Sequence, residues 1–290
     1  MVRKSYSDAE RKEHRDARLS AAHSQFQAGV AELLADDGAW QRYLTVQSKM
    51  HTYSFHNTLL ILSQNENASM VAGFRKWQEL GRNVRKGEKA IWILAPFSGK
   101  RHDEDPTTGE DVEHRFTYFK PVSVFDVSQT EGDPIPEPPS PVLLEGDSPE
   151  LVERYVAVQT ILEADGWTVK RESPEGGSNG DTDPKKRLVR VREDVSDAQA
   201  LKTLVYEQAH IVLVHVENME AYRQHRGRQE AEAESTAFLV LSGIGIDTSD
   251  YSLPYVAGWS NGNAKIVIEV AERVSKVARE LLDRLDWSES

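Results

Sequence analysis

Residues 53–96 read YSFHNTLLILSQNENASMVAGFRKWQELGRNVRKGEKAIWILAP, and this stretch decides how the first half of the chain folds. The apolar run at 57–64 predicts a helix, and a second short helix is expected at 73–80. Gly81 follows at the position where glycine commonly ends a helix. Residues 89–96 are apolar and predict a buried strand. The stretch therefore predicts mixed helix and strand in one domain.

The flanking sequence extends this pattern in both directions. Residues 7–36 and 40–50 predict helices before it, and 115–127 predicts one or two strands after a charged Gly/Pro loop at 99–113. In the second half, 167–171 and 188–192 alternate as a hairpin would, and helices are expected at 149–164, 198–216, 228–242 and 264–285. Because helices and short strands segregate rather than alternate, the predicted class is α+β in both halves.

A proline-rich segment separates the two halves. Residues 131–141 read EGDPIPEPPSP and hold five prolines. Proline at this density is incompatible with a helix or a central strand, so a semi-rigid linker is expected. The predicted organisation is a first domain at 1–130, a linker at 131–148 and a second domain at 149–290. The alternative is a long loop within one domain.

Composition restricts the classes of protein that the chain can be. It has 290 residues, a net charge of −12 and no cysteine, so any metal must be held by His, Asp or Glu. The polar start MVRKSYSDAERKEHRD does not have the apolar core of a signal peptide, and no run of about 18 apolar residues exists. We therefore expect a cytoplasmic protein with no membrane partner.

The charge is unevenly distributed, and aromatic residues lie beside its basic part. Residues 71–101 carry eight basic and two acidic residues, a net +6 within a chain of −12. Cations that follow phosphates, together with rings on which bases stack, are what binding of single strands requires. The alternative is that the rings form a core face and the cations a solvated one. The candidate binding residues are Tyr53, Phe55, Asn57, Arg75, Lys76, Trp77, Arg82, Arg85, Lys86 and Lys89.

A family resemblance favours the binding interpretation. The N-terminal half resembles the N-terminal domain of ArdC-type antirestriction proteins, and further motifs at 125–130 and 250–259 extend the similarity. The resemblance implies single-stranded DNA binding by residues from about 7 to 130, followed by a metallopeptidase-like domain. It also implies shielding of a mobile element's DNA or inhibition of host restriction. The residues that carry it are Tyr53-Ser54-Phe55, Asn57, Leu60, Gln64, Gly73-Phe74, Trp77, Leu80-Gly81, Val84, Lys86-Gly87-Glu88 and Ala95-Pro96.

The second half resembles a zincin peptidase of the gluzincin type. Such enzymes place His-Glu-x-x-His on a helix, so that two imidazoles one turn apart clamp zinc and the Glu acts as general base. Here Glu207 matches the base and His210 the second ligand. By the same match Glu230 is the third ligand, and Glu234 accepts a hydrogen bond that orients a ligand. Glu232 is expected to be solvated.

The first ligand position departs from this pattern, because residue 206 is Tyr. A phenol must lose its proton to ligate well. Three outcomes stay open: the metal is lost, zinc binds weakly through His210, Glu230 and Tyr206, or another histidine such as His225 substitutes. His215 is predicted to lie on a different helix face.

Two functions therefore remain as alternatives. One is a single-stranded DNA-binding protein of antirestriction type with an impaired peptidase domain. The other is an active zinc peptidase that cleaves a host restriction or regulatory protein.

Overall fold

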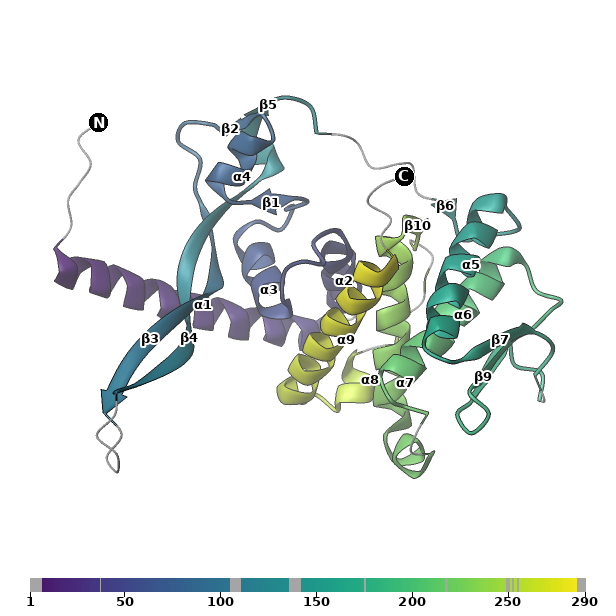
Figure 1. Ribbon diagram of the computed structural model, residues 1–290. Coiled ribbons are helices and arrows are strands. Elements are labelled where there is room, and N and C mark those ends of the chain that lie inside the picture. Colours follow the sequence, from purple (N-terminus) through teal and green to yellow (C-terminus); the bar gives the residue numbers. More distant parts are fainter. Residues whose placement is uncertain are drawn as a thin grey trace. The chain divides into compact units, whose positions relative to one another are not determined.

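The computed structural model describes residues 7–36, 38–104, 111–135, 142–174, 176–216, 219–248, 251, 253–254 and 256–285 (Figure 1). It divides into two compact units. Unit 1 comprises residues 1–29 and 59–135, and unit 2 comprises residues 30–58 and 136–290. Helices and small separate sheets make up both units, so the predicted α+β class is confirmed. Among the described residues, no helix combines enough length and apolar character to cross a membrane.

Unit 1 is built around a long antiparallel ribbon. A three-stranded sheet has the order β1-β4-β3, and β2 pairs with β5 in a separate two-stranded sheet. Helices α1 and α3 each contribute residues to both units. The elements are α1 (Asp8–Ala35), α3 (Phe55–Gln64), β1 (Val71–Ala72), α4 (Phe74–Glu79), β2 (Arg82–Val84), β3 (Ile91–Glu104), β4 (Asp111–Asp126), a 3-10 turn η1 (Val127–Gln129) and β5 (Thr130–Gly132).

The turn after α4 forms as the sequence predicts. Gly81 has φ +70°, a left-handed conformation that glycine adopts without steric cost. A Cβ at this position would lie 2.1 Å from Oδ2 of Asp133. The core of unit 1 lies beside this turn, where Trp77 is fully buried with Val71, Ile91 and Val124.

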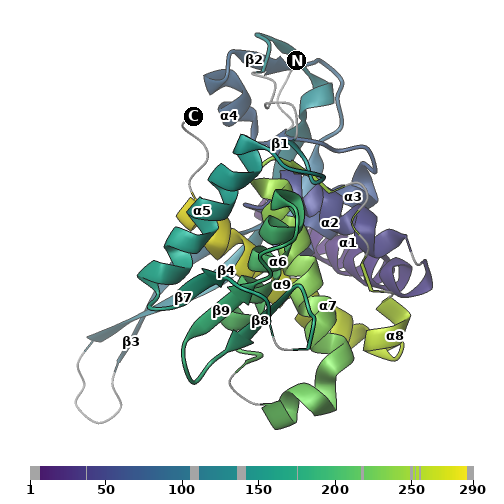
Figure 2. The same cartoon turned by 90° about the vertical axis from the view of Figure 1, so that its right-hand side faces the viewer.

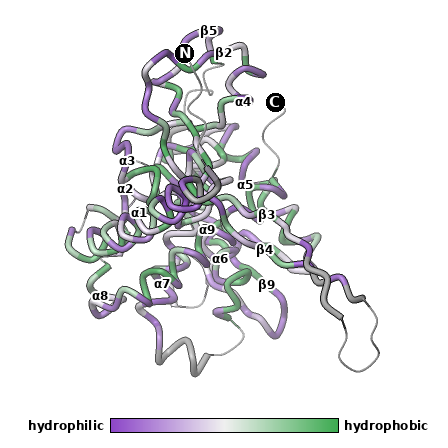
Figure 3. The backbone as a smooth tube through the Cα atoms, turned by 90° about the vertical axis from the view of Figure 1, so that its left-hand side faces the viewer, coloured by the Kyte–Doolittle hydropathy of each residue, from purple (hydrophilic) through white to green (hydrophobic). Residues whose placement is uncertain are grey.

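The prediction of a loop at 99–113 is wrong for the described residues of this range, 99–104 and 111–113, which form strands. Strand β3 continues to Glu104 and β4 begins at Asp111, so the two strands form a long ribbon (Figure 1). Hydrophobic and hydrophilic residues both occur along this ribbon (Figure 3). The charged residues that suggested a loop form ion pairs instead: Glu113 accepts from Lys100 of the opposite strand at 2.8 Å and from Arg115 of its own strand at 3.2 Å. Residues 105–110 lie outside the described part.

Unit 2 is a helical assembly with a three-stranded sheet, β7-β9-β8, and a two-stranded sheet, β10-β6. Helix α6 contacts α5 and α7, and α7 contacts α9 and α2. The elements are α2 (Ala39–Lys49), β6 (Val142–Leu143), α5 (Pro149–Ala164), β7 (Thr168–Arg171), β8 (Gly180–Asp183), β9 (Leu188–Val191), α6 (Asp197–Val212), α7 (Met219–Gly243), β10 (Ile246–Asp247), α8 (Val256–Ser260) and α9 (Ala264–Leu285).

The hairpin predicted from residues 167–171 and 188–192 is wrong, as the three-stranded sheet of unit 2 shows. Strands β7 and β9 pair in parallel, and β8 lies antiparallel to β9 in a sheet of order β7-β9-β8. The polar strand β8 lies in the segment between the two predicted strands, and it pairs with β9 through a tight turn in which Arg187 has φ +49°. The sheet borders α6, which β8 and β9 contact (Figure 2).

Residues 30–58 cluster with unit 2, although the sequence places them in a domain at 1–130. Two buried hydrogen bonds explain this packing. The indole of Trp40 donates to Ser235 of α7 at 2.9 Å, and the Tyr43 hydroxyl lies 2.7 Å from the Ser275 hydroxyl of α9. The transition from unit 1 to unit 2 after Ile135 falls within the proline-rich segment, whose residues 136–141 lie outside the described part.

Candidate functional site

Helix α6 carries the residues that the zincin pattern singles out. Ser196 caps the N-terminus of the helix, and its hydroxyl accepts a hydrogen bond from the backbone N–H of Gln199 at 3.3 Å. One helical turn separates Tyr206 from His210, so their rings meet edge to face with centroids 4.6 Å apart. Both residues face α7, which contributes the acidic groups.

Tyr206 forms a hydrogen bond with Glu230, the predicted third ligand. Its hydroxyl donates a hydrogen bond to Oε2 of Glu230, which joins α6 to α7. Arg226, one turn before Glu230, lies 3.8 Å from the other carboxylate oxygen. The carboxylate of Glu230 therefore has a phenol and a guanidinium as partners within unit 2.

Glu207 is buried beside this pair. Its side chain is 8% exposed and accepts a hydrogen bond from the hydroxyl of Thr182 in β8 at 2.7 Å. Burial raises the pKa of Glu207 to about 7, and the nearby carboxylates of Asp181 and Glu230 act in the same direction. A carboxyl group with this pKa can exchange a proton near neutral pH, as a general base or acid must.

His210 is oriented by a buried chain of polar groups. Its Nδ1 lies 3.0 Å from Nδ1 of His215, and Nε2 of His215 lies 2.9 Å from Oε2 of Glu232. Arg228 and Arg273 pair with Glu232 at 2.9 and 3.0 Å. Burial alone would raise the pKa of Glu232, but hydrogen bonds from His215 and Arg228 and the charge of Arg273 hold it below its usual value.

This series of hydrogen bonds determines which nitrogen of His210 carries no proton. With Glu232 ionised, His215 donates through Nε2 and accepts at Nδ1 from the Nδ1–H of His210. Nε2 of His210 then carries the lone pair. Burial, with a smaller contribution from His215, lowers the pKa of His210 to about 4, so the ring is neutral at pH 7.

Two expectations about this part of the chain are wrong. Glu232 is expected to be solvated, but it is completely buried between α6, α7 and α9. His215 is expected on a different helix face, but α6 ends at Val212 and Val214 adopts φ +60°, which turns the chain back. His215 therefore lies beside His210, a position that a helical projection cannot give.

Glu234 and His225 have other surroundings. Glu234 accepts a hydrogen bond from the hydroxyl of Tyr251 at 2.5 Å, and its pKa is raised by burial. The ammonium of Lys202 lies 4.1 Å from the Tyr251 ring centroid. His225, considered as a substitute ligand, is exposed at a kink in α7.

The residues present do not fit a three-ligand zinc centre. Within the described ranges, no three His, Asp or Glu side chains are arranged to hold a metal ion. His210 through Nε2 and Glu230 supply two suitable donors. Tyr206 supplies a phenol whose hydroxyl is already bonded to Glu230, and a phenol ligates only after it loses a proton with an ordinary pKa near 10.

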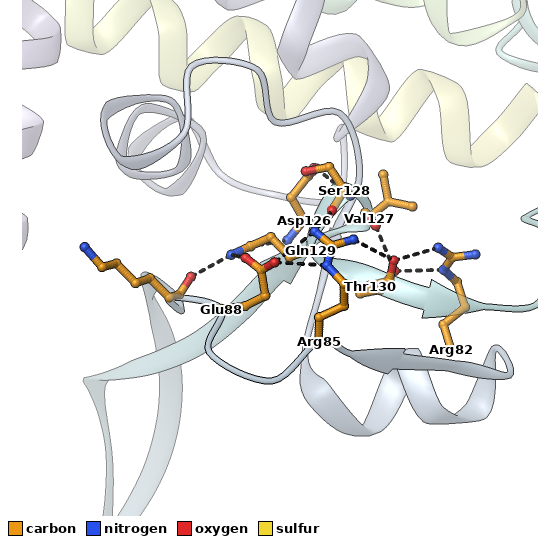
Figure 4. Close-up of polar contacts among 9 residues, drawn as sticks. Arg82, Arg85, Glu88, Asp126, Val127, Ser128, Gln129 and Thr130 are labelled. Atoms are coloured by element: carbon orange, nitrogen blue, oxygen red, sulfur yellow. Dashed lines mark hydrogen bonds and ion pairs between the residues drawn. The ribbon is translucent and has the colours of Figure 1, made fainter.

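In unit 1, two of the predicted DNA-binding cations have structural partners (Figure 4). Arg82 donates to the hydroxyl and carbonyl oxygens of Thr130 at 2.8 and 3.1 Å, and to the carbonyl of Asp133. Arg85 pairs with Glu88 at 2.8 Å and donates to the carbonyl of Ser128. These guanidinium groups hold η1 and β5 against β2.

The other predicted cations are exposed. Lys76 lies 3.4 Å from Glu79 on the surface of α4. Arg75, Lys86 and Lys89 are also exposed, and the contacts of the described residues include no ion pair to them. These four side chains are the part of the predicted basic surface that can reach a phosphate.

Two of the predicted aromatic residues are buried. Trp77 is completely buried, and its indole N–H donates to the carbonyl of Phe125 at 2.9 Å. Phe55 is 1% exposed and packs edge to face on Tyr43 within unit 2. Neither ring presents a face to a base. Tyr53 and Asn57 are half-buried and also belong to unit 2, so the predicted residues are divided between the two units.

Three exposed rings of unit 1 are not among the predicted binding residues. Phe97, Phe116 and Phe119 lie on the ribbon of β3 and β4 and are 38%, 49% and 57% exposed. The alternation of Phe116 and Tyr118 in RFTYFK, residues 115–120, is a signal that could have found Phe116.

Comparisons with known proteins show which proteins this chain is similar to. Residues 22–125 match the family model of the N-terminal domain of anti-restriction factor ArdC. The chain is 26% identical over 255 residues to an uncharacterised protein of Bacillus anthracis, a match that covers 76% of this chain and 42% of that protein. The chain thus spans less than half the length of this relative.

Solved structures extend the similarity. The Mn(II)-bound crystal structure of antirestriction protein ArdC from plasmid R388 is 18% identical, with a TM-score of 0.54, over 91% of this chain and 99% of that one. The metal-free structure of the same protein is 20% identical, with a TM-score of 0.48, over 79% and 84% of the two chains. The predicted resemblance is confirmed: the chain carries an ArdC-type N-terminal domain, and its fold is ArdC-like.

Proposed function

We propose that this chain binds single-stranded DNA as an antirestriction-type protein, shields the DNA of a mobile element, and has an impaired metallopeptidase-like half. The observation that carries the proposal is the match of residues 22–125 to the N-terminal domain of an anti-restriction factor. The exposed cations Arg75, Lys76, Lys86 and Lys89 lie within this region and support it. They form a basic surface on a chain whose net charge is −12.

The impairment rests on Tyr206. A zincin-type site needs three neutral or anionic donors that close around the ion. Here the hydroxyl of Tyr206 donates to Glu230, and only His210 and Glu230 remain as donors of the usual kind. We therefore expect zinc to bind weakly or not at all.

An active peptidase that cleaves a host restriction or regulatory protein is the second candidate. The observation that favours it is Glu207, which is buried near His210 and has a pKa raised to about 7. The Mn(II) bound by ArdC of plasmid R388 is consistent with this alternative. Stoichiometric zinc in the purified wild-type chain, lost on His210→Ala, would favour it over the first.

Fluorescence anisotropy of the full chain with a labelled oligothymidylate tests the proposal. We expect binding that is tighter than to a duplex of the same length and that weakens between about 50 and about 200 mM salt, because cations release counterions from phosphates. Removing three exposed cations, Arg75→Ala, Lys86→Ala and Lys89→Ala, should reduce the log–log salt slope by up to about 2.

The matched control removes three exposed cations of unit 2, Lys49, Lys170 and Lys185, and should leave the salt slope unchanged. Absence of binding by the wild-type chain at low salt would refute the proposed function. Equal slopes for the two triple variants would place the phosphate contacts elsewhere.

A further inference from the structure

Four side chains line one face of the outer β3–β4 ribbon. The register pairs Phe97 with Tyr118, Gly99 with Phe116 and Ala95 with Lys120. Residues two apart on a strand point to the same side, so these pairs share one face of the ribbon. We call the surface formed by Phe97, Phe116, Tyr118 and Lys120 the aromatic face.

The three rings form a continuous ladder. Phe97 and Tyr118 are stacked with centroids 6.1 Å apart and planes 30° apart, and Phe116 lies 5.7 Å from Tyr118 at 37°. Gly99 makes room for this arrangement, because a Cβ there would lie 2.6 Å from the Phe116 ring. The Phe116 ring therefore lies across β3, with about half of its surface exposed.

A cation lies over the ladder. Nζ of Lys120 is 4.9 Å from the centroids of both Phe97 and Tyr118. The contacts of the described residues include no carboxylate partner for Lys120. Its ammonium group therefore remains available to a phosphate while the rings offer apolar faces.

The opposite face of the ribbon differs in chemistry. There Glu113 pairs with Lys100 and Arg115, and Phe119 is a single exposed ring. The described side chains at 97–100, 113 and 115–120 include three cations and one carboxylate. Several neighbouring exposed rings with an adjacent cation suit an anionic ligand that has flat apolar groups.

We propose that the aromatic face is a stacking platform for the bases of unpaired DNA, with Lys120 contacting the backbone phosphate. The inference rests on the proposed function and names the surface that performs it. Base-on-ring stacking with cations that follow the phosphates is the general mode of single-strand binding. Paired bases are stacked on each other and cannot lie on these rings, so the platform selects unpaired strands.

The experiment compares two probes and two faces of the ribbon in the full chain. The probes are a labelled oligothymidylate and an abasic strand of equal length, which keeps the phosphates and lacks the bases. The double variant Phe116→Ala with Tyr118→Ala should lose affinity for oligothymidylate on the order of tenfold per ring removed. Its affinity for the abasic strand should be nearly unchanged.

The matched control is Phe119→Ala, which removes a more exposed ring from the opposite face and should leave both affinities unchanged. Two conservative variants guard against misfolding of the ribbon. Tyr118→Phe keeps a stacking ring and should bind as the wild type does. Phe116→Leu keeps apolar bulk without a ring and should weaken oligothymidylate binding selectively.

The outcomes separate this inference from the proposed function. If the wild-type chain binds oligothymidylate and the double variant binds equally well, the platform is overturned and the proposed function stands. An equal loss with Phe119→Ala, or an equal loss for the abasic strand, also overturns it. If the wild-type chain binds neither strand, both fail together.

Discussion

The phenol of Tyr206 and the carboxylate of Glu230 are joined by a hydrogen bond across α6 and α7. The pair satisfies a partly buried carboxylate with a neutral donor, so Glu230 has a partner without any metal ion. An imidazole at residue 206 could instead share an ion with His210 and Glu230. A single side chain thus decides whether these residues form a metal centre or a hydrogen-bonded cluster.

Tyr206→His should restore zinc binding. A zinc site with four ligands contributes about 10–16 kcal/mol, or roughly 3 kcal/mol per ligand, so we expect affinity to rise roughly a hundredfold. Metal analysis after dialysis, together with titration by a competing chelator, measures the change. Tyr206→Phe removes the hydroxyl without adding a ligand and should take up no zinc. A Tyr206→His chain that remains free of zinc would show that Glu230 is not a ligand.

Glu207 should make stability depend on pH. Its pKa is raised by burial from 4.5 to about 7, so the folded state keeps a proton that the unfolded state releases between these values. This contribution to stability is complete below pH 4.5 and is lost as the pH rises through 7. His210, with its pKa lowered by burial to about 4, acts oppositely between about pH 4 and 6.5.

Glu207→Gln removes the pH dependence that Glu207 causes and leaves the one that His210 causes. Relative to the wild type, the free energy of unfolding of this variant should improve by up to about 3 kcal/mol between pH 4.5 and pH 8. Urea unfolding at a series of pH values measures the difference. Glu153→Gln, at an exposed glutamate of α5, should show no such trend. A constant difference between Glu207→Gln and the wild type would contradict the assigned pKa.

At the scale of elements, Asp126 connects three segments of unit 1. The carboxylate is buried and accepts hydrogen bonds from the backbone N–H groups of Ser69, Met70 and Ser128 at 2.8, 3.1 and 2.9 Å. Its own N–H donates to the side chain of Gln129, which completes a capping box at η1. Burial alone would raise the pKa of Asp126, but these hydrogen bonds outweigh it and lower the pKa.

Asp126→Ala should destabilise unit 1. It leaves three part-buried backbone N–H groups without their acceptor, and we expect a loss of about 3 kcal/mol in the free energy of unfolding. Thermal and denaturant unfolding followed by tryptophan fluorescence measure this loss. Glu131→Ala, at an exposed position of β5, is the control and should change stability by less than about 0.5 kcal/mol. Equal effects of the two substitutions would contradict the stabilising role assigned to Asp126.

The ribbon of β3 and β4 shows why charged stretches mislead at this scale. Its outer residues look like a loop because charge and glycine are typical of loops. The charges instead pair across the strands, and Gly99 accommodates the ring of Phe116. Pairing between the two strands supplies the stabilisation that local propensity does not.

At the scale of the whole molecule, the position of charge matters more than its sum. The chain has a net charge of −12, yet residues 71–101 carry a net charge of +6. Two of these cations hold backbone carbonyls, so the basic surface is smaller than the sequence suggests. If the proposed DNA binding holds, we expect this region to approach the polyanion, because local charge steers association.

Local patterns determined the α+β class, most helices, the glycine turn at Gly81 and the resemblance to ArdC. They could do so because helix periodicity, caps and turn residues act over a few neighbouring residues. Tertiary structure alone decided that Trp77 is core, that Arg82 and Arg85 bind carbonyls, and that Glu232 and His215 support His210. The reason is physical: burial and the partner of a charged group depend on segments distant in sequence, which no local pattern encodes.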